Sequence, residues 1–283
     1  MTLPEKPSAK AQLRRLQAFP KKKMGQNFMT SARDLTFIAE ALSIGPQENV
    51  LEIGPGLGAL TEVLLASGAN VMAVEMDVKL AENLKRNATN KHLLRIICEN
   101  ILNVRLADLN LVSPLKIAGN IPYNITSPII EWLISQRKWI SETVLTVQWE
   151  VARRLTAKPG NKDWGSLSFF LQYYADVQLL RKIDKSHFYP SPKVDSAIVR
   201  LRFLKQGRFP VSDEERLFQC VRHAFQKRRK TLLNALLSED ADMPSKETIA
   251  SVLLKLSIDP RRRAETLSME EWVKLSESQI TKG

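Results

Sequence analysis

The chain has 283 residues, 44% hydrophobic and 25% charged, so it can form one large domain and a smaller one around a buried core. Two cysteines and three histidines argue against a disulfide framework and against a zinc or other metal site, so no metal is expected. No apolar run approaches the roughly 20 residues of a membrane span, and no hydrophobic signal core opens the chain. A cytoplasmic location away from membranes is the expectation.

The net charge of +12 is unevenly distributed, because residues 1–23 carry seven Lys/Arg against one acidic residue. Residues 1–23 thus hold half of the net positive charge, which predicts a flexible basic N-terminal arm over residues 1–23. Its acid-poor composition also resembles an organellar transit peptide, but three prolines interrupt a long amphipathic helix there.

Residues 209–283 are nearly neutral, yet they contain two basic runs, Lys227-Arg228-Arg229-Lys230 and Arg261-Arg262-Arg263. Clusters of this kind favour an RNA or other polyanionic partner, although a single run also suits an ordinary solvated helix face.

Strands and helices alternate from residue 49 onward. Apolar runs predict strands over 50–53, 71–74, 94–98, 115–118 and 143–148, and amphipathic patterns predict helices over 59–66, 77–87 and 126–136. Two more strands, 178–183 and 196–203, precede four predicted helices over 213–225, 230–237, 246–256 and 269–276. The alternation is typical of a parallel sheet covered by helices on both faces. We therefore predict an α/β, Rossmann-like domain over residues 24–208 and an all-helical domain over residues 209–283.

A glycine-rich loop, Glu52-Ile-Gly54-Pro-Gly56-Leu-Gly58, joins the first of these strands to its helix. Gly54 and Gly56 permit a tight turn and a close approach of the backbone to a ligand. Glu75 ends the next strand, from where a carboxylate can accept hydrogen bonds from both hydroxyls of a ribose. An NAD-binding fold is the alternative to S-adenosylmethionine (SAM), but the glycine spacing differs from Gly-x-Gly-x-x-Gly, and Pro55 removes one backbone donor from the loop.

A second motif, Asn120-Ile121-Pro122-Tyr123, follows the fourth strand. An amide oxygen and the Ile121 carbonyl can accept the two N–H bonds of an adenine amino group, and this localises the nitrogen lone pair. Pro122 stiffens the loop and Tyr123 can stack on the purine face. The pair of motifs is typical of a methyltransferase that modifies an exocyclic amine.

Two further side chains have two possible roles each. Asn100, at the end of the third strand, suits either an adenine contact or a turn that satisfies local backbone. Phe188, at the start of a proline-rich loop, suits either stacking on the other face of the base or ordinary core packing.

With these motifs the chain resembles the KsgA/RsmA family of ribosomal RNA adenine dimethyltransferases. The matching stretches cover nearly the whole chain: 23–28, 50–61, 74–77, 119–128, 188–199, 225–234 and 258–267. The resemblance implies transfer of two methyl groups from SAM to N6 of each of two adjacent adenosines near the 3′ end of small-subunit rRNA, within the assembling small ribosomal subunit.

The protein is expected to be a monomer. The resemblance also implies a set of cofactor contacts at Asn27, Met29, Gly54, Glu75, Asn100 and Asn120. Met29 stands where the family more often has leucine, and Asn100 where it usually has aspartate. An Erm-type enzyme acting on large-subunit rRNA shares the Asn120 loop, but the 188–199 and 227–234 stretches fit the KsgA/RsmA family better. A binding protein, either an assembly checkpoint or a relative of mitochondrial transcription factors, is the alternative from a different class.

Overall fold

A computed structural model describes residues 7–21, 25–109, 114–227, 229–237 and 245–278. The chain divides into two compact units, residues 1–152 with 176–205 and residues 153–175 with 206–283. Within the described residues, no helix combines the length and apolar character needed to cross a membrane.

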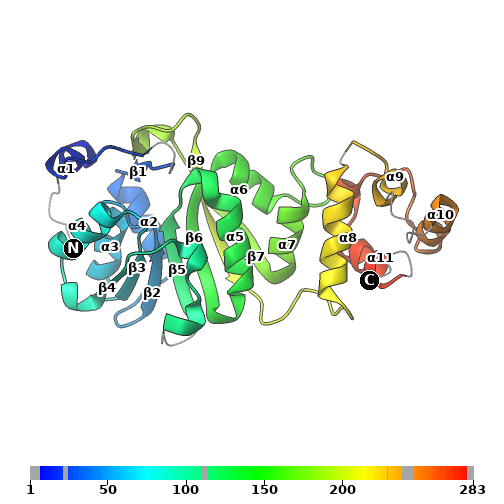
Figure 1. Cartoon of the computed structure of the whole chain (residues 1–283), viewed down its shortest axis with the longest axis horizontal. Helices are drawn as coiled ribbons and strands as arrows, with labels where there is room; N and C mark the ends of the chain where they lie inside the picture. The colour runs from blue at the N-terminus through cyan, green and yellow to red at the C-terminus, as the bar shows by residue number, and fades with distance from the viewer. Residues whose placement is uncertain (1–6, 22–24, 110–113, 228, 238–244, 279–283) are drawn as a thin grey trace. The chain divides into compact units, whose positions relative to one another are not determined.

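The first unit is built on a seven-stranded sheet of order β4-β3-β2-β5-β6-β9-β7 (Figure 1). Its strands are β2 (Asn49–Ile53), β3 (Asn70–Val74), β4 (Leu94–Ile97), β5 (Leu115–Asn120), β6 (Ile140–Gln148), β7 (Ala175–Ile183) and β9 (Ser196–Phe203). The first five are parallel, and β9 runs antiparallel to β6. The predicted α/β, Rossmann-like class is confirmed.

Helices accompany the strands as the alternating pattern predicts. They are α2 (Ala32–Ala41), α3 (Ala59–Ala66), α4 (Val78–Asn87), α5 (Thr126–Ser135) and α6 (Trp149–Thr156), the last of which ends beyond the unit. Fully buried side chains from α2, α3 and the sheet, such as Ile38, Leu64 and Val144, form the core. Burying each such side chain stabilises the fold by about 1.5–3 kcal/mol.

The N-terminal segment is more ordered in its described part than the expected flexible arm. Residues Ala9–Arg15 form helix α1, capped by the Ser8 hydroxyl, which accepts from the Ala11 N–H. Ala9 and Leu13 are buried against Phe28 and Leu57. The apolar spacing within residues 9–16 therefore folds part of the basic arm onto the first unit.

A small two-stranded sheet brings together segments far apart in the sequence. Strand β1 (Phe28–Met29) pairs antiparallel with β8 (Phe188–Tyr189), so Met29 lies opposite Phe188. The His187 carbonyl accepts from both the backbone N–H and the hydroxyl of Thr30. The proline-rich loop is thus fastened to the segment that precedes α2.

The second unit is helical, with α7 (Ser166–Tyr174), α8 (Glu214–Gln226), α9 (Leu232–Leu236), α10 (Lys246–Lys255) and α11 (Met269–Glu277). Aromatic rings hold α7 to α8, since Phe169, Phe170 and Tyr173 all lie within 6.5 Å of Phe218, measured between ring centroids. Residues 153–175, which the boundary expected near residue 208 leaves in the first domain, therefore group with the helical unit.

Candidate active site

The carboxyl ends of the parallel strands border a cavity of about 710 Å³. The strand order places β2 between β3 and β5, which is the switch point where open α/β sheets bind ligands. Two backbone hydrogen bonds hold the strand ends together, from Gly54 N–H to the Val74 carbonyl and from Glu75 N–H to the Ile97 carbonyl. A volume of this size suits a cofactor.

The glycine loop presents its backbone to this cavity. Gly54 has φ +65°, and no heavy atom lies within 4 Å of the place where a Cβ would be. Gly56 has φ +58°, and a Cβ there would lie 2.9 Å from Cε1 of Phe28. Both positions therefore require glycine, the first for its backbone conformation and the second also for space.

Glu75 lies opposite the loop and is only 5% exposed. One carboxylate oxygen accepts from the Gly56 N–H at 3.0 Å and the other from the Asp77 N–H at 2.9 Å. Burial raises the pKa of Glu75, although these hydrogen bonds oppose the rise. Each oxygen keeps a second lone pair, so the carboxylate can accept further bonds from two hydroxyls.

Glu52, which the sequence analysis treated only as part of the glycine loop, also lines the cavity. Its side chain is 1% exposed, and the Thr61 hydroxyl donates to Oε2 at 2.6 Å. Burial raises the pKa of Glu52 to about 8, and the nearby Glu75 adds to the rise. The signal in the sequence is a carboxylic side chain inside an otherwise apolar strand, because such a side chain is buried with its neighbours.

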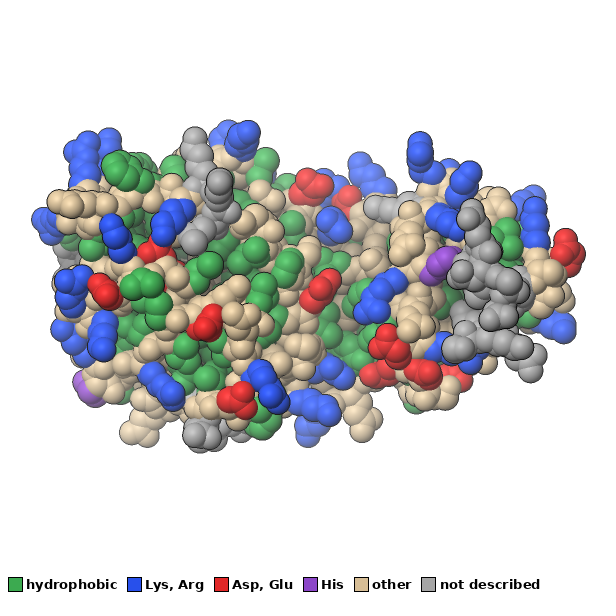
Figure 2. Space-filling view, viewed as in Figure 1, with side chains coloured by type: hydrophobic (Ala, Val, Ile, Leu, Met, Phe, Trp, Pro, Cys, Tyr) green, Lys and Arg blue, Asp and Glu red, His purple; other side chains and the backbone are tan. Residues whose placement is uncertain are grey.

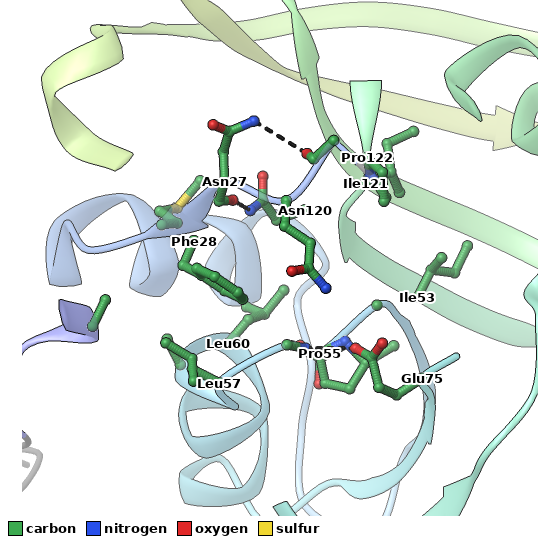
Figure 3. Close-up of a pocket in the computed structure, with 18 of the residues that line it drawn as sticks. Asn27, Phe28, Ile53, Pro55, Leu57, Leu60, Glu75, Asn120, Ile121 and Pro122 are labelled. Atoms are coloured by element: carbon green, nitrogen blue, oxygen red, sulfur yellow. Dashed lines mark hydrogen bonds between the residues drawn. The ribbon is translucent and has the colours of Figure 1, made fainter. Parts of the chain in front are cut away.

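Asn120 is oriented by a hydrogen bond to the N-terminal segment. Its Nδ2 donates to the backbone carbonyl of Asn27 at 2.8 Å, and Asn27 Nδ2 in turn donates to the Gly25 carbonyl (Figure 3). Both asparagines line the cavity. This bond orients the amide, and Oδ1, its only acceptor atom, is left to accept a hydrogen bond from a ligand.

The rest of the loop is held in the same region. Ile121 is 1% exposed and Pro122 has φ −59°, and both line the cavity together with Tyr123. The hydroxyl of Tyr123 pairs with that of Ser196 on β9 at 2.5 Å. Burial raises the pKa of Tyr123, so the phenol stays neutral and its ring is fixed at the cavity wall.

Asn100 and Met29 also line the cavity. The Asn100 Oδ1 accepts from the Leu102 N–H at 3.1 Å and caps the short helix Ile101–Asn103. It therefore serves the local turn, and one lone pair of the same oxygen stays available to a ligand. Met29 is 4% exposed and belongs to the core cluster.

Phe188 does not line the cavity. Phe188 is 4% exposed and packs in the core cluster rather than lining the cavity, so contact with a base requires this ring to leave its packing. In the run 227–230, Lys227 donates through Nζ to the Leu237 carbonyl, whereas Arg229 and Lys230 are exposed. Arg228 lies outside the described residues.

The residues of the cavity fit SAM by their chemistry. The open backbone at Gly54 leaves room for close approach, and the buried Glu75 carboxylate supplies acceptors for a diol. Among the part of the chain that the structure describes, no group of three His, Cys, Asp or Glu side chains is placed to hold a metal ion.

The strand order, the cavity at the switch point and the paired motifs define a Rossmann-like SAM-dependent methyltransferase, in agreement with the prediction. Residues 19–278 match the family described as ribosomal RNA adenine dimethylase, so the chain belongs to that family and is an rRNA adenine dimethyltransferase that uses SAM. The resemblance to the KsgA/RsmA family is thereby confirmed.

Similar proteins agree with this assignment. The ribosomal RNA small subunit methyltransferase A of Moorella thermoacetica is 40% identical over 266 residues, which are 91% of this chain and 91% of that protein. A dimethyladenosine transferase from Plasmodium falciparum has a similar structure, with a TM-score of 0.73, 25% identity and coverage of 88% of this chain and 95% of that one. The 23S rRNA methyltransferase ErmE has a TM-score of 0.69 and 26% identity, and the match covers 88% of this chain and 98% of that one.

Proposed function

We propose that this enzyme dimethylates N6 of two adjacent adenosines in the 3′-terminal loop of small-subunit rRNA, within the assembling subunit, and that it acts as a cytoplasmic monomer. The observation that carries the proposal is the hydrogen bond from Asn120 to the Asn27 carbonyl, which leaves the Asn120 amide oxygen to accept from an amine. The 40% identity to a small subunit methyltransferase A over 91% of both chains supports the choice of the small subunit.

The cofactor would be held by residues from three strand ends and from the N-terminal segment. We assign the loop backbone at Gly54 and Gly56 to close approach and Glu75 to the ribose hydroxyls. Asn100 contacts the adenine ring, while Asn27 and Met29 contribute from the N-terminal side. SAM supplies a methyl group on a sulfonium centre, which is electrophilic enough that the site needs no strong base.

The chain's own residues would align the acceptor nitrogen. An adenine amino group is a poor nucleophile because its lone pair is delocalised into the ring. The Asn120 Oδ1 and the Ile121 carbonyl accept its two N–H bonds and thereby draw the nitrogen towards tetrahedral geometry. Tyr123 stacks on the purine with its ring already fixed by Ser196. Catalysis then comes from alignment and from hydrogen bonds that strengthen in the transition state.

Binding of the subunit requires phosphate contacts, and we assign part of these to the basic residues 227–230 of the helical unit. The target adenosines must leave their stacked positions to enter a cavity of this kind. A strained or single-stranded loop lowers the cost of that step.

The test is mass spectrometry of small-subunit rRNA after undermethylated subunits are incubated with the enzyme and SAM. The expected product is two adjacent N6,N6-dimethyladenosines near the 3′ end. Modification of large-subunit rRNA instead would assign the enzyme to the Erm type. Tight subunit binding without methylation of either rRNA would make it an assembly factor.

A further inference from the structure

Helix α1 and the segment after it carry an exposed aromatic ring, Phe19, and three exposed cations, Lys10, Arg14 and Arg15. Phe19 is 85% exposed, whereas Ala18 and Pro20 on either side of it are partly buried. A phenylalanine left in water forgoes about 1.5–3 kcal/mol of burial free energy. Such a ring calls for an explanation when the chain around it is held in place.

The backbone before Phe19 is held by a helix-ending motif. Gln17 adopts φ +47°, its N–H donates to the Arg14 carbonyl, and the Ala18 N–H donates to the Leu13 carbonyl. This pair of hydrogen bonds is the Schellman arrangement, which reverses the chain at the end of a helix.

The backbone after Phe19 is held as well. The Lys21 N–H donates to the side-chain oxygen of Gln26 at 2.9 Å, and Lys21 Nζ lies 2.7 Å from Asp77 Oδ2. Asp77 also caps α4 by accepting from the Lys79 N–H. Phe19 therefore stands between two fixed points, and its exposure is a property of the folded segment.

Three exposed basic residues precede Phe19 in the same described segment. Lys10, Arg14 and Arg15 are exposed whereas Ala9 and Leu13 are buried, and Figure 2 shows Lys and Arg side chains gathered at the margin where Figure 1 places α1. Within the described residues, none of these three cations has a carboxylate within salt-bridge distance. Unpaired cations attract a polyanion through the release of its counterions.

Other residues of the same segment line the cavity, namely Pro7, Ser8, Ala9 and Gln12, as does Met76 beside Asp77. We propose that Lys10, Arg14, Arg15 and Phe19 form a binding surface for single-stranded RNA, which holds nucleotides that flank the base in the cavity. Cations that track phosphates beside an aromatic ring on which a base stacks are the usual components of such surfaces. The proposal rests on rRNA being the substrate.

An anionic membrane is the other surface that a basic helix with an exposed aromatic ring could bind. The apolar face of α1 is, however, already packed against Phe28, Leu57 and Leu80. Membrane-bound amphipathic helices insert a continuous apolar face, whereas in α1 the apolar residues Ala9 and Leu13 are buried. The charge and the single ring therefore favour RNA.

The experiment measures binding of the full chain to a short unstructured oligo(U) by fluorescence anisotropy across a salt series. Phe19→Leu should raise the Kd roughly five- to 150-fold, because base stacking is lost, whereas Phe19→Tyr should retain wild-type affinity. The double variant Arg14→Gln/Arg15→Gln should lower the slope of log K against log salt by about 1.4, which corresponds to two phosphate contacts on a single strand.

Lys138→Gln is the matched control, because Lys138 is exposed in the turn before β6, at the opposite edge of the sheet from the cavity. It should leave oligo(U) affinity unchanged. SAM affinity, measured by calorimetry, should be unchanged in all variants, which shows that the fold is intact.

Wild-type affinity of Phe19→Leu and of the arginine double variant for oligo(U) would overturn the proposal. The proposal would also be overturned, in favour of a membrane, if these variants bound oligo(U) like the wild type but lost the wild type's binding to vesicles of phosphatidylserine and phosphatidylcholine. If the wild type methylates no rRNA but Phe19→Leu still weakens oligo(U) binding, the proposed function fails and the RNA surface stands.

Discussion

The side-chain amide of Asn120 donates to the backbone carbonyl of Asn27, a residue 93 positions earlier in the chain. One partner ends the central strand β5, and the other immediately precedes β1. The bond fixes the orientation of the amide, so the N-terminal segment sets the direction in which the Asn120 Oδ1 can accept a hydrogen bond. Loop and segment thus act together on the proposed acceptor nitrogen.

Asn120→Ala should lower the rate of methyl transfer by several orders of magnitude, while SAM affinity is largely retained. The side chain removed is the proposed acceptor for the adenine amino group, whereas Gly54 and Glu75 are untouched. A filter assay with undermethylated subunits measures transfer, and calorimetry measures SAM binding. Asn87→Ala, on the exposed side of α4, is the control, and near-normal turnover of Asn120→Ala would rule out the proposed alignment mechanism.

The sequence predicts which strand ends line the cavity, because strand ends can be placed from apolar runs. The Gly54 loop, Glu75, Asn100 and Asn120 each follow a predicted strand, and the parallel sheet brings all four to one cavity. Strand periodicity is local information, and the carboxyl ends of parallel strands share an edge by geometry.

Contacts between distant segments were not predictable in this way. The pairing of β1 with β8 places Phe188 in the core, and nothing in the local sequence distinguishes that position from a stacking one. Helix α1 was missed because its basic composition suggested an exposed arm, while its burial depends on an apolar surface formed by Leu57 and Leu80. Tertiary packing decides both outcomes.

Asn100→Asp should leave activity intact and, if anything, lower the Kd for SAM. The Oδ1 atom of Asn100 caps the Leu102 N–H, a bond that an aspartate oxygen can also accept. The second oxygen of aspartate replaces an N–H₂ donor with an acceptor, which suits the amino group of an adenine. Calorimetry on both proteins measures the change, and a large loss of SAM affinity in Asn100→Asp would contradict the assigned contact.

Replacing the basic residues 227–230 by glutamine should weaken binding to the small subunit and flatten its salt dependence. The residues of the run differ in the structure, since Lys227 donates to the Leu237 carbonyl whereas Arg229 and Lys230 are exposed. Arg229→Gln/Lys230→Gln should therefore account for the change in salt slope, by about 1.8 for two contacts to duplex phosphates. Lys227→Gln should instead lower thermal stability. An unchanged slope in the double variant would assign the run to solubility.

Glu52→Gln should flatten the pH dependence of the free energy of unfolding of the cofactor-free protein. Burial raises the pKa of Glu52 from 4.5 to about 8, so the native state holds this proton over a pH range in which the unfolded state has lost it. Stability falls with rising pH wherever the native state binds more protons. The loss from Glu52 therefore begins near the unfolded pKa of 4.5 and is complete once the pH exceeds about 8.

Glutamine carries no charge at any of these pH values, and its amide oxygen can still accept from the Thr61 hydroxyl. The free energy of unfolding of Glu52→Gln minus that of wild type should thus rise by at least about 1 kcal/mol between pH 5 and pH 9. Urea denaturation at a series of pH values measures this difference, with the exposed Glu131→Gln on α5 as the control. Parallel curves for Glu52→Gln and wild type would mean that the Glu52 carboxyl ionises in the folded protein as readily as in the unfolded chain, despite its burial in the cavity wall.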